Sequence, residues 1–192
     1  MQCIGAGRRR FSFSEDFDMR RLLVVVDMQK DFVDGALGFE EAKTIIPGIS
    51  KRIQEYKDAG DEVVYTLDTH AENYMETMEG KNLPVPHCIK GTEGFNLVDE
   101  LSGLLEGCKC FEKPTFGSME LARYIEENRE DLSSIEICGL VSNICVISNT
   151  VLAKAAAPET EIIVDSNLTS CFDPKLTEAA LDICRSIHVK VL

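Results

Sequence analysis

Apolar residues along this chain form short continuous runs that alternate with segments of helical periodicity. Six runs have the length and apolar content of strands buried on both faces of a sheet. They cover residues 22–26, 63–67, 108–111, 135–138, 162–164 and 187–191. Helical spacing is seen around residues 49–56 and over 97–105, 119–128, 143–157 and 174–185. This alternation predicts an α/β fold, a doubly wound and mostly parallel six-stranded sheet with helices on both faces.

Two segments lie outside this pattern. Residues 1–18 follow neither periodicity, and a second methionine, Met19, stands just before the first run. We therefore expect an N-terminal extension or tag-like segment at 1–18 and one folded domain at 19–192. Residues 68–107 are rich in Gly, Pro and Asn and show little regular pattern before residue 97. An irregular stretch of this length inside a compact domain usually carries function.

Reactive side chains follow four successive runs. Asp27 comes after the first, Asp68 and His70 after the second, Lys113 after the third, and Cys145 after the fourth. In a doubly wound sheet the ligand crevice lies at the carboxyl ends of the strands, so we expect these groups to converge. An aspartate, a lysine and a cysteine together can deprotonate a thiol, hold the thiolate and pass the proton to a leaving amine.

Cys145 lies in the sequence I-E-I-C-G-L-V-S-N-I-C-V at residues 135–146, where an apolar run meets Gly139 and a helix is predicted to open. In the first turn of a helix the positive end of the helix dipole would favour thiolate over thiol. The alternative is a buried cysteine that serves only packing. Because Asp27 and Lys113 are expected at the neighbouring strand ends, we favour the interpretation of Cys145 as a nucleophile.

A metal site is predicted in the irregular segment. Asp68 and His70 are two residues apart, so on extended backbone they point the same way and can share one ion. His87 lies in L-P-V-P-H-C, where the prolines stiffen the backbone. Three N or O ligands leave open positions, which is typical of a catalytic metal. The alternative is two ordinary loop histidines, and His188, in the last run, is expected to be structural.

The composition narrows the classes of partner. A net charge of −13 argues against binding nucleic acid or an anionic membrane surface through bulk electrostatics, and it suits a small neutral or cationic substrate. The eight cysteines include no C-x-x-C pair and accompany no secretory signal, so we expect reduced thiols in a cytoplasmic protein. No apolar stretch approaches the roughly 20 residues that span a bilayer.

Five sequence blocks resemble the nicotinamidases of the isochorismatase-like cysteine hydrolase superfamily. The blocks are D-M-Q-K-D-F at 27–32, L-D-T-H at 67–70, P-H-C-I-K-G-T-E-G at 86–94, E-K-P-T-F-G-S at 112–118 and G-L-V-S-N-I-C-V at 139–146. The similarity runs from about Arg20 to the C-terminus. The D-x-H pair followed by the histidine of P-H-C is typical of the metal-binding nicotinamidase branch.

The resemblance implies a reaction and a role for each of three residues. Cys145 would be the nucleophile, Asp27 its general base and Lys113 the stabilising third member. The reaction would be the hydrolysis of nicotinamide to nicotinate and ammonia through a thioester, as in pyridine nucleotide salvage.

The resemblance also implies how the substrate is held. Phe32 would stack on the pyridine ring, and a cis peptide at Leu140 and Val141 would help to form the oxyanion hole with backbone N–H groups near Val141 and Cys145. Many nicotinamidases place an aromatic residue just before P-P-H, whereas here N-L-P-V-P-H puts Leu83 or Pro84 near that place.

By the same resemblance Asp68, His70 and His87 become metal ligands. Glu79 has the spacing of a fourth ligand, nine residues after His70, and Glu76 is a second candidate. The ion would be divalent, with zinc preferred and iron or manganese as alternatives.

Two other functions stay open. One is a related amidohydrolase that acts on another small amide or a carbamoyl compound, and the other is a catalytically silent binding protein. For both enzyme functions, the nicotinamidase and the related amidohydrolase, we expect a small-molecule amide as the partner and neither nucleic acid nor a membrane. The chain is also expected to form a homo-oligomer.

Overall fold

A computed structural model of the chain describes residues 19–192, so the expectation for residues 1–18 lies outside the described residues. In the described part, six strands form one sheet in which every pairing is parallel, in the order β3-β2-β1-β4-β5-β6. The strands are β1 (Arg20–Val26), β2 (Glu62–Asp68), β3 (Lys109–Lys113), β4 (Leu132–Leu140), β5 (Glu161–Ser170) and β6 (Lys190–Val191). The predicted six-stranded α/β sheet is confirmed.

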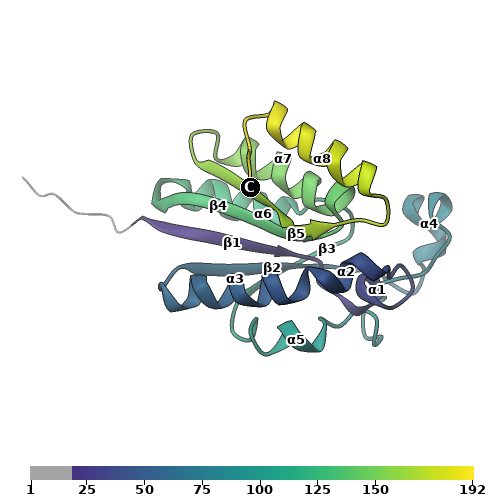
Figure 1. Cartoon of the computed structure of the whole chain (residues 1–192). Helices are drawn as coiled ribbons and strands as arrows, with labels where there is room; N and C mark the ends of the chain where they lie inside the picture. The colour runs from purple at the N-terminus through teal and green to yellow at the C-terminus, as the bar shows by residue number, and fades with distance from the viewer. Residues whose placement is uncertain (1–18) are drawn as a thin grey trace, which may run out of the picture.

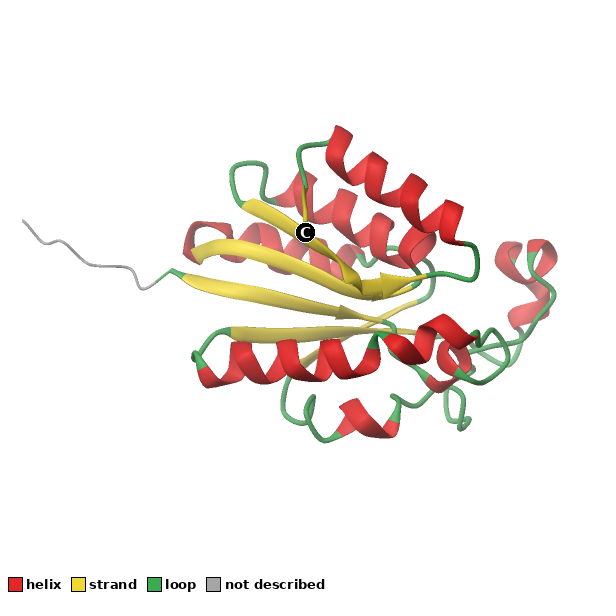
Figure 2. Cartoon of the chain, viewed as in Figure 1, coloured by secondary structure: helices red, strands yellow, loops and turns green. Residues whose placement is uncertain are grey.

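Helices cover both faces of this sheet (Figures 1 and 2). One side carries α1 (Lys30–Val33), α2 (Glu40–Thr44), α3 (Ile46–Asp58) and α5 (Asp99–Ser102). The other side carries α6 (Met119–Asn128), α7 (Ile147–Ala156) and α8 (Pro174–Ser186). The short helix α4 (Met78–Asn82) stands apart from both layers, beyond the carboxyl ends of the strands.

The central strand β1 explains why the strand signal is a continuous apolar run. Leu22, Val24 and Val26 belong to the core beneath α6, α7 and α8, whereas Leu23 and Val25 belong to the core beneath α3. Because successive side chains of a strand point to opposite faces, a strand covered on both sides must be apolar at every position.

The chain reverses its direction across the sheet between β1 and β4. From β1 it builds outward through β2 to β3, and then it returns to place β4 on the other side of β1. Such a switch point opens a crevice at the carboxyl ends of the two strands. Gly139 lets β4 run close to β1 here, because its φ is +110° and an added Cβ would lie 2.1 Å from the carbonyl oxygen of Val26.

Two predicted helices differ from the structure. The segment predicted as one helix over 143–157 begins with a π-helical turn, Ser142–Val146, and α7 starts only at Ile147. The helix predicted over 97–105 is limited to α5, because turns follow Ser102. The irregular segment also contains a 3₁₀ turn, Tyr74–Glu76, and α4, neither of which the periodicity indicated.

The last strand is shorter than predicted. The run at 187–191 forms a strand only at Lys190–Val191, because the N–H groups of His188 and Val189 bond back to the carbonyls of Arg185 and Cys184 and so complete the end of α8. The φ of His188 is +64°, and its side chain is exposed. The expectation that His188 lies inside a strand is therefore wrong.

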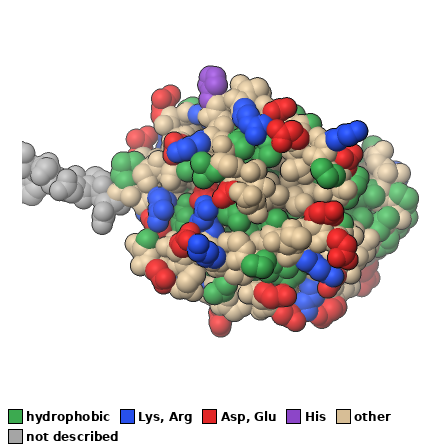
Figure 3. Space-filling view, in the orientation of Figure 1, with side chains coloured by type: hydrophobic (Ala, Val, Ile, Leu, Met, Phe, Trp, Pro, Cys, Tyr) green, Lys and Arg blue, Asp and Glu red, His purple; other side chains and the backbone are tan. Residues whose placement is uncertain are grey.

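The surface shown in Figure 3 carries interspersed acidic and basic side chains, and apolar ones gather at the end of the molecule where α4 lies. Met78 is 73% exposed there. Within residues 19–192, no helix combines the length and the apolar character that crossing a membrane requires. The seven cysteines of the described residues are unpaired.

We predict that Gly139→Ala destabilises the fold by about 3 kcal/mol or more, because the new Cβ meets backbone and the residue keeps a positive φ. Gly103→Ala is the matched control, since an added Cβ at Gly103 meets nothing within 4 Å and its φ is −67°. The midpoint of urea unfolding measures the stability of both variants. A midpoint for Gly139→Ala equal to that of Gly103→Ala would contradict the close approach of β4 to β1.

Candidate active site and metal centre

The structure brings the side chains of Asp27, Lys113 and Cys145 together at the switch point. Lys113 Nζ lies 2.7 Å from Asp27 Oδ2 and 3.5 Å from Cys145 Sγ. The three residues are only 0%, 1% and 4% exposed. An acid, a cation and a thiol that come from three different segments thus share one buried space.

Asp27 is held by its backbone and by one hydroxyl. It follows β1 directly, at a φ of +49° that only a few non-glycine residues adopt, a type of strain that gathers at functional sites. Thr66 on β2 donates a hydrogen bond from Oγ1 to Asp27 Oδ1 at 2.6 Å. Oδ2 faces Lys113 and has no hydrogen bond of good geometry from any described residue. The sequence analysis missed Thr66, whose only signal was a polar residue inside a buried strand.

Lys113 is a buried cation shared by two carboxylates. The register of β2 and β3 pairs Asp68 with Lys113, and Nζ lies 3.3 Å from Asp68 Oδ1. Burial by itself would lower the pKa of Lys113, but Asp27, Cys145 and Asp68 together raise it well above its ordinary value. Lys113 therefore carries its proton.

The burial of Cys145 works against the thiolate that was expected at a helix start. Burial raises the pKa of Cys145 well above its usual range, Asp27 adds to the rise, and Lys113 opposes it. Burial also raises the pKa of Asp27, and Lys113 offsets only part of that rise. A carboxylate with a raised pKa is a stronger base, so this pair is arranged for proton transfer from sulfur to carboxylate.

The turn that carries Cys145 is fixed on both sides. The Leu140–Val141 peptide is cis, as predicted, and the carbonyl of Val141 accepts hydrogen bonds from the N–H groups of Ile144 and Val146 at 3.1 and 3.2 Å. Ser142 Oγ lies 2.8 Å from Thr169 Oγ1 on β5.

Asn149 on α7 holds the turn from the other side. Its amide donates to the carbonyls of Cys145 and Phe116 at 2.8 and 3.2 Å, and its Oδ1 accepts from the N–H of Ser118 at 2.9 Å. Asn149 was not predicted, although a buried carboxamide inside a helix was its signal.

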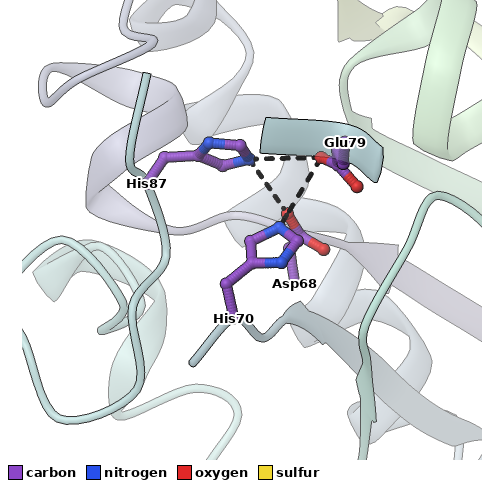
Figure 4. A group of neighbouring side chains, drawn as sticks. All are labelled: Asp68, His70, Glu79 and His87. Atoms are coloured by element: carbon purple, nitrogen blue, oxygen red, sulfur yellow. Dashed lines mark hydrogen bonds and ion pairs between the residues drawn. The ribbon is translucent and has the colours of Figure 1, made fainter. Parts of the chain in front are cut away.

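The four predicted metal ligands form one group (Figure 4). Asp68 Oδ2 lies 3.0 Å from His70 Nε2 and 3.3 Å from His87 Nε2, and Glu79 Oε1 lies 3.6 and 3.7 Å from the same two nitrogens. One possible ligand atom from each residue lies within 4.8 Å of all the others. Glu76, the second candidate, is not in this group.

The chemistry of this group fits a divalent metal. His87 Nδ1 lies 2.8 Å from the carbonyl oxygen of Val85, which can only accept, so the proton is on Nδ1 and the lone pair of Nε2 faces the group. Burial and the nearby Asp68 raise the pKa of Glu79, because two carboxylates crowd one site. A cation would relieve that repulsion, and two imidazoles with two carboxylates are ligands that zinc, iron and manganese accept.

A cavity of about 190 Å³ reaches both Cys145 and the metal-ligand group. Its wall is lined by Phe32, Leu37, Phe39, Asp68, Glu79, Leu83, His87, Phe116, Val141, Ile144, Cys145 and Phe172. The predicted residues Phe32 and Val141 are on this wall. Of the two candidates Leu83 and Pro84, Leu83 lines the cavity and Pro84 does not. Leu140 is fully buried in the core and does not line the cavity, so its part is limited to the peptide that it shares with Val141.

A parallel sheet in this strand order, with an aspartate, a lysine and a cysteine at its switch point, defines an α/β protein with a candidate cysteine hydrolase site. The isochorismatase domain model matches residues 21–192, so the chain belongs to the isochorismatase family.

Several solved structures resemble the chain over most of their length. A pyrazinamidase of Pyrococcus horikoshii in complex with zinc is 27% identical with a TM-score of 0.77, over 90% of this chain and 98% of that chain. A nicotinamidase/pyrazinamidase from Bacillus subtilis is 28% identical with a TM-score of 0.80, over 90% and 99%. An N-carbamoylsarcosine amidase from Thermoplasma acidophilum is 25% identical with a TM-score of 0.73, over 90% and 95%. No curated protein sequence matches the chain.

We predict that Lys113→Met slows alkylation of Cys145 by iodoacetamide at pH 8 about tenfold or more. The reason is that Lys113 lowers the pKa of Cys145, and each added pKa unit removes nine-tenths of the thiolate. Mass spectrometry of the Cys145 peptide measures the rate, with circular dichroism to check folding. Lys90→Met, at an exposed ion pair with Glu112, is the control and should leave the rate unchanged.

Proposed function

We propose that the chain is a nicotinamidase, which hydrolyses nicotinamide to nicotinate and ammonia. The cavity wall carries this proposal. It is apolar and aromatic between Cys145 at one side and the metal-ligand group at the other, and no arginine or lysine of the described residues lines it. A flat, uncharged ring amide suits such a wall, whereas an anionic substrate would bury its carboxylate without an arginine or lysine to pair with.

The reaction would proceed through Cys145. Asp27 takes the thiol proton while the ammonium of Lys113 stabilises the sulfur, and the thiolate attacks the carboxamide carbon. We assign the oxyanion to the backbone N–H groups of Val141 and Cys145. Asp27 then gives the proton to the departing ammonia, which leaves a thioester. Asp27 deprotonates a water molecule that hydrolyses the thioester and releases the acid.

The ring would lie against Phe32. Asp68, His70, Glu79 and His87 would hold a divalent metal, with zinc preferred and iron or manganese as alternatives. When bound, this metal would supply a Lewis acid for the nitrogen of a pyridine ring. The zinc in the related pyrazinamidase supports this assignment.

A second enzyme activity has one observation in its favour. The N-carbamoylsarcosine amidase shares the fold at 25% identity, so a related amidohydrolase that acts on a carbamoyl compound is the alternative. The wall argues against it, because a carbamoyl amino acid carries a carboxylate and no described arginine or lysine lines the cavity. A catalytically silent binding protein is a weaker alternative, since Asp27, Lys113 and Cys145 are all present and in contact. The homo-oligomer, the cytoplasmic location and the place in pyridine nucleotide salvage stay predictions.

We expect Cys145→Ala to reduce ammonia release from nicotinamide by about 10³-fold or more, because the nucleophile is lost. Cys108→Ala, which removes a half-buried cysteine that does not line the cavity, is the control and should keep the rate. An enzyme-coupled ammonia assay with nicotinamide and with an N-carbamoyl amino acid measures both. Ammonia release retained in Cys145→Ala would refute the thioester, and preferential turnover of the carbamoyl compound would refute the nicotinamide assignment.

We further expect the purified protein to hold about one divalent ion per chain and His87→Ala to lose it, because His87 supplies one of the four ligands. His188→Asn is the control, since His188 is exposed and asparagine tolerates its positive φ. Elemental analysis counts the metal, and a chelator should abolish activity that added zinc restores. Stoichiometric metal in His87→Ala would contradict the ligand set.

A further inference from the structure

Gln29, two residues after Asp27, makes contacts that the proposed reaction does not use. Its side chain is fully buried. Its Oε1 accepts a hydrogen bond from the N–H of Asp68 at 2.7 Å, and its Nε2 donates to the carbonyls of Asp68 and Phe95, both at 2.9 Å. One carboxamide therefore holds both the donor and the acceptor of the Asp68 main chain.

This contact replaces a missing strand neighbour. The pairing of β1 with β2 ends where Val26 lies opposite Thr66, so Asp68, at the end of β2, has no partner from β1. The carboxamide of Gln29 supplies the two hydrogen bonds that a strand would have made there. Asp68 is thereby fixed at the point where its carboxylate meets Lys113, His70 and His87.

Asp31 holds a second backbone segment of the metal-ligand group in a similar way. Its carboxylate accepts hydrogen bonds from the N–H of Cys88 at 2.7 Å and of Ala36 at 3.1 Å. Cys88 directly follows His87 and has a φ of +46°. Its carbonyl oxygen accepts a hydrogen bond from the N–H of His70 at 3.0 Å. Asp31 thus anchors the peptide that connects the two histidine segments.

We propose that Gln29 and Asp31 are positioning residues that set the geometry of the metal-ligand group. Residues 27–31 then serve both halves of the site, because Asp27 faces the thiol while Gln29 and Asp31 fix the backbone of Asp68 and of the residue after His87. This inference rests on the metal centre of the proposed function.

The test is zinc affinity of the full chain, measured by calorimetry without substrate. Gln29→Met keeps the size of the side chain and removes its three hydrogen bonds, so we expect zinc binding to weaken about 10- to 100-fold. Asp31→Asn, at a partly exposed side chain, replaces a charge-assisted acceptor with a neutral one, so a loss of about three- to tenfold is expected. The d–d absorption of the Co²⁺-loaded protein should change in Gln29→Met, because it reports ligand geometry.

Asn149→Leu is the matched control. It also removes a buried carboxamide that bonds three backbone groups, but those groups belong to Phe116, Ser118 and Cys145. Its zinc affinity and Co²⁺ spectrum should match those of the wild type even where its thermal stability falls as far as that of Gln29→Met.

The outcomes separate the two levels of the proposal. A wild type that binds zinc, together with Gln29→Met and Asp31→Asn variants of equal affinity, would overturn the positioning role alone. An Asn149→Leu variant that loses as much affinity as Gln29→Met would do the same, since general destabilisation would then explain both. A wild type that binds no zinc would overturn the metal centre and this inference with it. Should Gln29→Met fail to fold, Asp31→Asn decides.

Discussion

One buried ammonium group holds the two halves of this site together. Lys113 lies between the carboxylates of Asp27 and Asp68 and against the sulfur of Cys145. Two carboxylates buried near each other cannot both stay ionised without a cation between them. The same contact keeps Lys113 protonated, since burial alone would have favoured the neutral amine. Asp27, Cys145 and the metal-ligand group therefore depend on a charge balance that no one of them achieves alone.

The parallel sheet is what makes this balance possible. Strand order places β3, β2, β1 and β4 side by side, and the groups at or after their carboxyl ends are Lys113, Asp68, Asp27 and Cys145 in the same order. Neighbouring strands lie about 4.8 Å apart, a distance that side chains at adjacent strand ends readily bridge. Since parallel strands all end at one edge, reactive groups from four segments that lie far apart in sequence meet there.

The sequence predicted most of the frame and most of the chemical groups, and the failures have a common cause. Continuous apolar runs revealed β1 and β4, and the residues after them revealed Asp27 and Cys145. Thr66 and Asn149 were missed because a polar residue in a buried element shows its role only through a partner far away in sequence. The expected thiolate character of Cys145 rested on a local effect, whereas burial, a tertiary property that the sequence does not reveal, raises the pKa of its thiol. Glu79 came from resemblance alone, since no periodicity places α4.

The cavity is built from two kinds of segment, and this division bears on how such enzymes diversify. Asp68 and Cys145 lie at or after strand ends, whereas Leu37, Phe39, Leu83, Phe116 and Phe172 come from the connections between elements. Connections tolerate substitution and insertion far better than a sheet that is packed on both faces. New substrates can thus be acquired by exchanging a few aromatic and aliphatic side chains of these connections, while the groups at the strand ends stay untouched. The same frame could in this way have served amides with and without rings.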